Sequence, residues 1–150
     1  GDLCASKKYI IMNTHSLKLN YIWNRIIPNF SFESWRSIPS EYMAPGVYRW
    51  SITRANGDTS YYIGESVNLR RRIRNYSVPG PNQMTSLRIN KLFKTELKRK
   101  SKILLELIDL KELRVDNKVF SKKDLKSSYT RKLIENLVLV EHSDLKVHNL

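Results

Sequence analysis

The sequence has one cysteine, Cys4, among 150 residues. A single thiol excludes an intrachain disulfide and a cysteine-based metal centre, which fits a reducing compartment. No apolar run approaches the roughly 20 residues that cross a bilayer, and no segment resembles a secretory signal peptide. We therefore expect an intracellular, cytoplasmic protein, or part of a larger one, that is about one domain in length and needs no covalent staples.

Acidic residues are scarce as well. The chain has 14 Asp or Glu against 27 Lys or Arg, which gives a formal net charge of +13. The excess is local, because residues 66–102 contain eleven Lys or Arg and one acid, whereas residues 103–150 contain nine basic and eight acidic residues. A dense basic block indicates nucleic acid or an anionic membrane surface as the partner. Since arginine, tyrosine and asparagine in this block are groups that contact phosphates, we favour nucleic acid.

Glycine and proline are also few, with five of each, and they fall at informative positions. An Asn-Gly pair at residues 56–57 lies between two alternating segments, residues 46–52 and 60–63, and this pattern predicts a β-hairpin. A glycine ends the second strand, and Ser66 is placed to cap a helix over about residues 67–76. The predicted unit is strand, turn, strand, glycine and helix.

This predicted helix carries an arginine on its inward face. Four of its residues fall at i, i+3, i+4 and i+7 and therefore share one side: Leu69, Arg72, Ile73 and Tyr76. The other three arginines point elsewhere and can reach solvent. An arginine is almost never fully buried without a partner, so Arg72 either meets one in a site or packs its stem on apolar surface with its head in water. Periodicity leaves both alternatives open.

These residues resemble the GIY-YIG nucleases, a family that includes phage homing endonucleases, some restriction enzymes and the bacterial excision-repair nuclease. Residues 46–48, Gly-Val-Tyr, are similar to the GIY element, and residues 62–64, Tyr-Ile-Gly, are similar to the YIG element. Arg72 matches the family's essential arginine, and Tyr76 matches a position that holds His in homing endonucleases and Tyr in the repair enzyme. Two features depart from the pattern. The connection between the elements is somewhat longer, and Glu65 stands where the repair enzyme has Lys, which argues against lysine-assisted activation of the nucleophile.

A carboxylate in the last predicted helix, residues 129–141, is the second unusual group. Glu135 lies in an almost entirely aliphatic segment, where a buried carboxylate requires a counter-charge, a metal ion or an exposed cleft. The alternative is a solvent-exposed ion pair with Arg131, four residues earlier. The family's single catalytic glutamate lies on the helix after the third strand, which implies Glu135, with Asn149 near the family's supporting asparagine. Glu141 is a rival that matches less well.

The resemblance implies a metal-dependent endonuclease that hydrolyses phosphodiester bonds in DNA. Glu135 would hold Mg²⁺ or Mn²⁺ through oxygen, and Arg72 would stabilise negative charge on the phosphate. Tyr48 would position or deprotonate the attacking water, although an ordinary tyrosine pKa near 10 makes it a poor base at neutral pH. Tyr62 and Tyr76 would orient phosphate and water. For each tyrosine the alternative is a packed aromatic side chain. The residues expected to contact the nucleic acid are exposed basic side chains and one asparagine: Arg70, Arg71, Arg74, Arg88, Lys91 and Asn149.

Two other classes of function remain open. The first is a nucleic-acid-binding module of the same fold without catalytic activity. The second is an anionic-lipid-binding or protein-binding domain that uses the aromatic residues of the N-terminal segment. His142 and His148 match no standard metal-site spacing, and histidines near a chain end are more often solvated.

The expected fold is α+β. Residues 46–150 would form the GIY-YIG-like domain, with a small three-stranded antiparallel sheet flanked by helices. The third strand, residues 103–110, is nearly continuous in apolar residues and should be central. Residues 1–45 would form an N-terminal extension packed on the core, with a helix over about residues 16–27 followed by an irregular aromatic segment.

Overall fold

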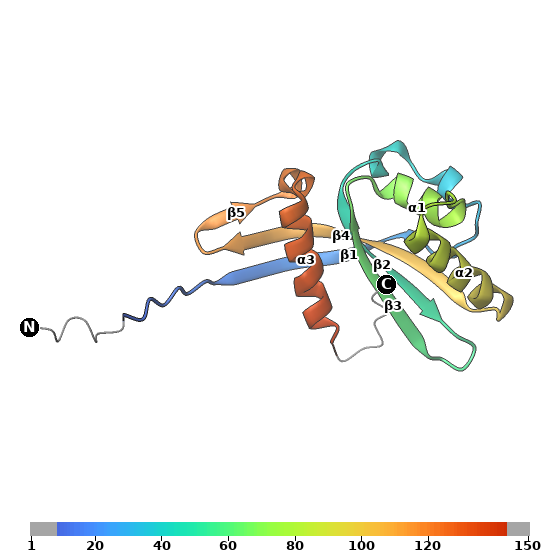
Figure 1. Cartoon of the computed structure of the whole chain (residues 1–150), viewed down its shortest axis with the longest axis horizontal. Coiled ribbons are helices and arrows are strands. Elements are labelled where there is room, and N and C mark those ends of the chain that lie inside the picture. Colours follow the sequence, from blue (N-terminus) through green and yellow to red (C-terminus); the bar gives the residue numbers. More distant parts are fainter. Residues whose placement is uncertain (1–8, 144–150) are drawn as a thin grey trace, which may run out of the picture.

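The computed structural model describes residues 9–143. The fold is α+β, with an antiparallel five-stranded sheet in the order β1-β4-β2-β3, β5 paired to β4, and helices on both faces (Figure 1). The strands are β1 (Leu17–Ile27), β2 (Gly46–Thr53), β3 (Thr59–Ser66), β4 (Lys102–Val115) and β5 (Lys118–Phe120). The α-helices are α1 (Leu69–Ser77), α2 (Met84–Lys98) and α3 (Ser128–Glu141). Short 3-10 helices are η2 (Ser34–Ser37), η3 (Ser40–Tyr42) and η4 (Lys122–Lys126). The α+β class is confirmed, but the sheet is larger than the predicted three strands.

β2 and β3 form the predicted hairpin. Its turn is closed by the Arg54 backbone N–H, which donates to the Asp58 carbonyl at 2.8 Å. Gly57 takes a φ of +90°, a backbone conformation that glycine adopts without steric cost. The Asn56 side-chain oxygen accepts the Asp58 N–H at 2.9 Å, which fixes the turn further. The Asn-Gly signal therefore located the turn correctly.

β4 is the central strand, as predicted, but it is longer than the expected residues 103–110. It pairs with β2 over residues 102–107, with β1 over residues 105–115 and with β5 over residues 113–115. Helices or loops cover both of its faces, so Leu105 is buried toward α1 and α2 while Ile108 is buried toward α3. This two-sided burial explains the nearly continuous apolar sequence.

The helix predicted over residues 16–27 is wrong, because this segment is the strand β1, an edge of the sheet paired antiparallel to β4. Its apolar residues alternate with polar ones at its beginning, which is the period of a strand. Leu19, Tyr21 and Trp23 pack against the apolar cluster beneath α3. The N-terminal part of the chain is therefore not a helical extension, since it supplies a strand to the same sheet as β2 and β4.

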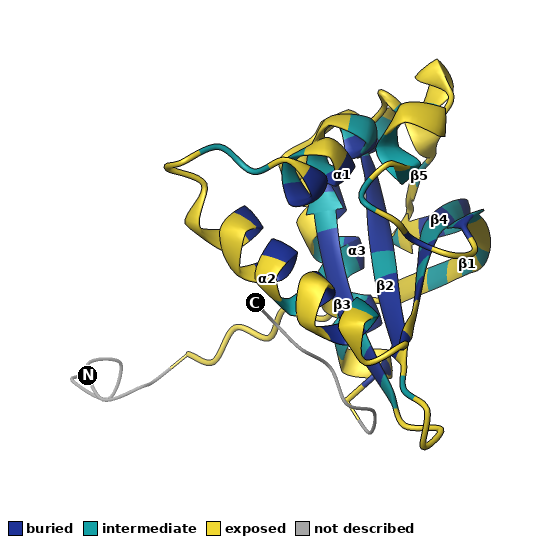
Figure 2. Cartoon of the chain, turned by 90° about the vertical axis from the view of Figure 1, so that its right-hand side faces the viewer, coloured by how far each residue is buried: buried dark blue, intermediate teal, exposed yellow. Residues whose placement is uncertain are grey.

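The sheet separates two apolar clusters. On one face α1 and α2 pack with Trp50, Ile52 and the irregular segment that contains η2 and η3. On the other face α3 packs with Val47 and Ile63. Figure 2 shows β2 and β3 largely dark blue, buried between these layers. Among the described residues, no helix is both long and apolar enough to cross a membrane. The edge strand β3 thus contributes to both clusters, with Tyr62 in one and Ile63 in the other.

α1 begins at Leu69, two residues later than predicted, and Ser66 is not its cap. The Asn68 side-chain oxygen accepts the Arg71 backbone N–H at 3.0 Å and caps the helix instead. The Ser66 hydroxyl bonds to the backbone of Asn68, donating to its carbonyl at 2.9 Å. Both side chains therefore fix the turn that leads from β3 into α1.

Candidate functional site

Three tyrosines and one arginine gather on the α1 side of the sheet. The hydroxyl oxygens of Tyr48 on β2 and Tyr76 on α1 are 2.8 Å apart. The Tyr62 ring on β3 lies 6.3 Å from the Tyr48 ring and 6.5 Å from the Tyr76 ring. Arg72, one turn before Tyr76, is partly exposed and interacts with all three phenols. The sequence elements that carry the family resemblance thus meet in one cluster.

The charge of Arg72 is secured by these neighbours. Burial opposes the charge, but the adjacent Tyr48, Tyr76 and Tyr62 side chains outweigh it, so the pKa of Arg72 is raised. The side chain is therefore a permanent cation. Of the two alternatives that periodicity left open, the structure has Arg72 within a polar cluster rather than simply lying on apolar surface.

Tyr48 and Tyr62 are poor bases in this arrangement. Burial is the largest effect that raises the pKa of Tyr48, followed by the neighbouring Tyr76 and Tyr62, and Arg72 lowers it by less. Burial also dominates the raised pKa of Tyr62. Tyr48 is only 1% exposed. These phenols consequently stay protonated near neutral pH and can act as hydrogen-bonding, orienting groups.

Gly64 makes room for the Tyr48 side chain. The two residues are directly opposite each other in the β2–β3 ladder. A Cβ atom at position 64 would lie 2.5 Å from the Tyr48 hydroxyl oxygen and 2.7 Å from its Cζ. Because Tyr48 is buried and hydrogen-bonded, it cannot swing away without cost. The glycine of the second motif is therefore needed for the close approach of the tyrosine of the first.

Substituting Gly64→Ala is expected to destabilise the protein by about 1–3 kcal/mol, the usual cost of overpacking, and to displace the Tyr48 hydroxyl. Urea unfolding followed by tryptophan fluorescence measures this. Gly80→Ala is the matched control, because a Cβ there would meet only Gln83, at 3.5 Å or more. Equal midpoints for the two variants would contradict the packing role of Gly64.

Glu135 approaches the same region from the opposite face of the sheet. It is partly exposed on α3, and its pKa is raised by burial and then by the neighbouring Glu65, while Lys132 and Arg72 lower it by less. Glu135 therefore lies close enough to Arg72 and Glu65 for electrostatic interaction. Both helices contact β3, which is an edge strand of the sheet, α1 from one face and α3 from the other.

Arg131 does not form the helix ion pair with Glu135 that was the alternative interpretation of this carboxylate. Its Nε donates to Glu65 Oε2 at 2.6 Å, and its Nη1 donates to the carbonyls of Leu125 and Lys126 at 2.8 and 2.9 Å. The Arg131 side chain is 7% exposed and that of Glu65 is 19% exposed. This pair ties α3 to the end of β3 one helical turn before Glu135. The sequence analysis did not identify this ion pair. A signal was present, because Arg131 lies three residues before the buried Ile134 and therefore on the same, inward face of α3.

The described residues expected to contact nucleic acid lie outside the tyrosine cluster and differ in exposure. Arg70 is half-buried and its Nε donates to the Ile38 carbonyl at 3.1 Å. Arg71, Arg74, Arg88 and Lys91 are exposed on α1 and α2. Asn149 lies outside the described residues. The rival carboxylate Glu141 accepts a hydrogen bond from the Tyr21 hydroxyl on β1.

His142 is buried, contrary to the expectation that it would be solvated. Its exposed fraction is 5%. Because Arg49 has only donors, the His142 Nε2 accepts from Arg49 Nη1 at 2.8 Å, and Nδ1–H donates to the Val138 carbonyl at 2.8 Å. The Arg49 guanidinium in turn lies 4.3 Å from the centre of the Trp23 ring. We interpret His142 as part of a packed polar network that holds the C-terminal end of α3 to the sheet.

Within residues 9–143, no three His, Cys, Asp or Glu side chains converge as a metal-binding group. The local donors suited to a hard divalent cation are the carboxylate oxygens of Glu135 and its neighbour Glu65. Arg131 binds Oε2 of Glu65, whereas Glu135 forms no ion pair with any residue of 9–143, so Glu135 is the carboxylate better placed to bind a cation.

Comparisons of the chain with protein-family models, with curated proteins and with solved structures found no match.

Proposed function

We propose that the protein is a metal-dependent endonuclease that hydrolyses phosphodiester bonds in DNA, as the GIY-YIG resemblance implies. One observation supports this above all others. Arg72 is a fixed cation among three phenols, and the partly exposed Glu135 carboxylate of α3, on the other face of the sheet, lies within range of its weak electrostatic influence. A fixed cation and a nearby carboxylate are groups that phosphodiester hydrolysis requires.

Arg72 binds and stabilises the phosphate in this proposal. Its guanidinium donates to a non-bridging oxygen whose negative charge grows in the transition state. A preorganised donor of this kind contributes roughly 3 kcal/mol. The interaction with Tyr76 and the packing of Leu69 and Ile73 in the core hold the α1 face in place. Arg72 therefore needs little reorganisation when substrate arrives.

The phenols orient the reacting groups. Because the pKa values of Tyr48 and Tyr62 are raised, both keep their protons and donate hydrogen bonds. Of the two roles that the resemblance implies for Tyr48, positioning of water is favoured over its deprotonation. The Tyr48–Tyr76 hydrogen bond links β2 to α1, so the orientation of one phenol depends on the other.

Glu135 is the residue that would hold Mg²⁺ or Mn²⁺. A single carboxylate leaves the remaining coordination positions for water and phosphate oxygens, as Mg²⁺ prefers. The raised pKa of Glu135 also fits, because a cation would relieve its repulsion from Glu65. When bound, such an ion supplies positive charge for the phosphate and lowers the pKa of a coordinated water.

Replacing Arg72 tests the proposal directly. In a plasmid-nicking assay with Mg²⁺ or Mn²⁺, we expect Arg72→Ala to lower the cleavage rate more than a hundredfold, which corresponds to roughly 3 kcal/mol. Arg114→Ala is the control, because this exposed arginine lies at the other end of the molecule, beside β5 (Figure 1). If folded wild type and folded Arg72→Ala give the same background nicking, the protein is not this nuclease.

A second candidate is a nucleic-acid-binding module without cleavage. The burial of the Tyr48 hydroxyl favours it, since a group that is 1% exposed reaches no substrate in this conformation. This alternative predicts DNA binding that weakens steeply with salt, is unaffected by Glu135→Ala, and leads to no cleavage with either metal.

A further inference from the structure

We propose that the cleft between α1 and the segment of residues 35–43 is a subsite for a backbone phosphate of DNA, next to the phosphate that is cleaved. This inference rests on the proposed nuclease function, because it takes DNA as the ligand. It assigns the irregular aromatic N-terminal segment a part in substrate binding.

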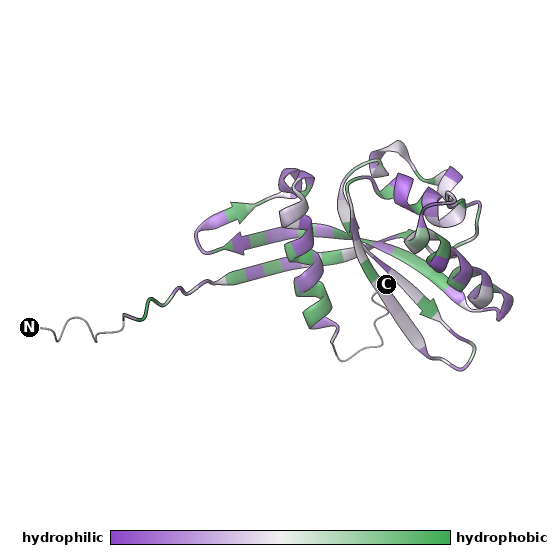
Figure 3. Ribbon diagram, in the orientation of Figure 1, coloured by the Kyte–Doolittle hydropathy of each residue, from purple (hydrophilic) through white to green (hydrophobic). Residues whose placement is uncertain are grey.

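The subsite is a small, defined cavity. Its volume is about 200 Å³, and it is lined by Trp35, Met43, Asn68, Arg70, Arg71 and Arg74. The wall formed by α1 is strongly hydrophilic, as the purple turns of this helix in Figure 3 show. Arginine and asparagine side chains are donors that suit a phosphate oxygen.

The two walls of the cleft are joined by hydrogen bonds. Arg70 Nε donates to the Ile38 carbonyl at 3.1 Å, and the Leu69 backbone N–H donates to the Ala44 carbonyl at 3.1 Å. Ile38 is itself buried in the core. The cleft is therefore built into the fold.

The Trp35 ring contacts two guanidinium groups, one of them from a residue that lines the cleft. Those of Arg36 and Arg74 each lie 5.4 Å from the centre of the Trp35 ring, within the range of cation–π interaction. The indole thereby restrains Arg74, which lines the cleft, and Arg36 of η2 beside it. This arrangement costs less entropy on binding than freely rotating side chains would.

These charges lack compensation within the described chain. Arg70, Arg71 and Arg74 form no ion pair with a carboxylate of residues 9–143. Arg36 pairs only with Glu33, at 3.1 Å, and both side chains are exposed, so this pair is weak. Several cations that converge without acids favour an anionic ligand.

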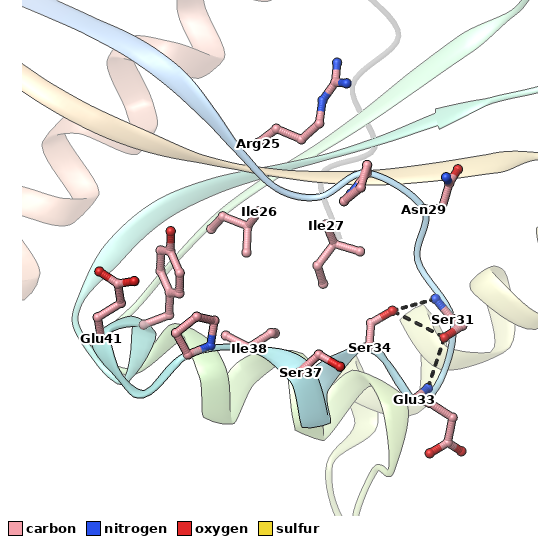
Figure 4. A pocket seen from close by; sticks show the side chains of 13 residues that line it. Arg25, Ile26, Ile27, Asn29, Ser31, Glu33, Ser34, Ser37, Ile38 and Glu41 are labelled. Carbon is pink, nitrogen blue, oxygen red and sulfur yellow. Dashed lines mark hydrogen bonds between the residues drawn. The ribbon is translucent and has the colours of Figure 1, made fainter.

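The opposite side of the same segment has a different character. A larger cavity of about 450 Å³ lies there, between the end of β1 and the η2–η3 segment (Figure 4). Glu33 and Glu41 border it around a floor that includes Ile27. Its lining holds one arginine, Arg25, against these two carboxylates, so its charge suits a phosphate less than the arginine-lined cleft does. DNA is therefore expected on the α1 side of the segment and not on this one.

A DNA strand explains the position of the cleft better than a separate small anion does. Arg71 in the cleft and Arg72 in the tyrosine cluster are consecutive residues of α1, so they point about 100° apart around one helix. A polyanion can contact both arginines at once, because successive phosphates of one strand can reach Arg71 and Arg72 separately. Such contacts involve no bases. The subsite would thus position the scissile phosphate at Arg72 without specifying sequence.

Binding of a fluorescent DNA duplex without metal, in chelator, tests the subsite separately from cleavage. We expect Arg71→Gln and Arg74→Gln each to reduce the slope of log K against log salt by about 0.9, the value for one lost phosphate contact. Trp35→Leu should weaken binding as well, because Arg36 and Arg74 lose their support. Arg114→Gln, the distant exposed control, should leave the slope unchanged. Circular dichroism verifies that each variant is folded.

The outcomes separate the two proposals. Unchanged slopes for both cleft variants would overturn the subsite, even if Arg72→Ala abolishes cleavage. Reduced slopes with no cleavage by wild type would support the subsite and overturn the nuclease. Tighter binding to anionic vesicles than to the duplex, lost in the same variants, would show that the cleft serves a membrane surface and would overturn the DNA assignment.

Discussion

Replacing Glu135 by glutamine is expected to abolish cleavage and, at the same time, to stabilise the folded protein. The loss of activity should be at least about a thousandfold, because metal-ion stabilisation of a transition state is worth several kcal/mol and each 1.36 kcal/mol is tenfold. The gain in stability follows from the environment of this carboxylate. Burial and the neighbouring Glu65 raise its pKa, so its charged form is less favourable in the fold than in the unfolded chain.

The sign of the pH dependence is fixed by that raised pKa. Below the ordinary pKa of 4.5, the carboxyl is neutral in both states and the two proteins should be equally stable. As pH rises through the folded-state pKa, the wild type loses stability that Glu135→Gln retains. The difference in free energy of unfolding should therefore grow between pH 4 and pH 8. Urea denaturation at several pH values measures it.

Glu141→Gln is the matched control for this experiment. It alters another glutamate of α3, but one that contacts Tyr21 on β1 and not the tyrosine cluster. We expect its cleavage rate to equal that of wild type. A Glu135→Gln variant that still cleaves DNA, or that is less stable than wild type at pH 8, would contradict the assigned environment of Glu135.

Local signals in the sequence predicted much of the fold. The hairpin depends on an Asn-Gly turn, and the inward stripe of α1 depends on helical spacing, so both could be recognised within a few residues. β1 could not be recognised in this way. Leu17 and Tyr21 fit the i, i+4 spacing of a helix as well as the alternation of a strand. Pairing with β4, whose partner residues are far along the chain, decides between the two.

The candidate site was predictable as a set of residues but not as an arrangement. The motif spacing identified Arg72 and the tyrosines, yet nothing local indicates that α1 and α3 pack on opposite faces of the same edge strand. Arg131 illustrates the limit. Its local i−4 relation to Glu135 suggested a helix ion pair, whereas its partner Glu65 is 66 residues away. A buried, long-range pair leaves no periodic signal in the sequence.

Removing Arg131 is expected to cause the largest loss of stability among these substitutions. We expect Arg131→Met to lower the free energy of unfolding by about 3 kcal/mol, at the lower end of the range for breaking a buried ion pair. The substitution leaves Glu65 without its counter-charge and removes the donor to the Leu125 and Lys126 carbonyls. Methionine fills a similar volume, so lost packing contributes little.

A double-mutant cycle with Glu65 separates the ion pair from the helix contacts. In Arg131→Met/Glu65→Gln no unpaired charge remains, so we expect the double variant to recover part of the lost free energy of unfolding. The difference between its loss and the sum of the two single losses measures the coupling between Arg131 and Glu65. The exposed pair of Arg36 and Glu33 provides the comparison, since Arg36→Met should cost less than about 1 kcal/mol. Equal costs for Arg131→Met and Arg36→Met would mean that the Arg131–Glu65 contact does not hold α3 against β3. The position of Glu135, one turn further along the same helix, would then require another cause.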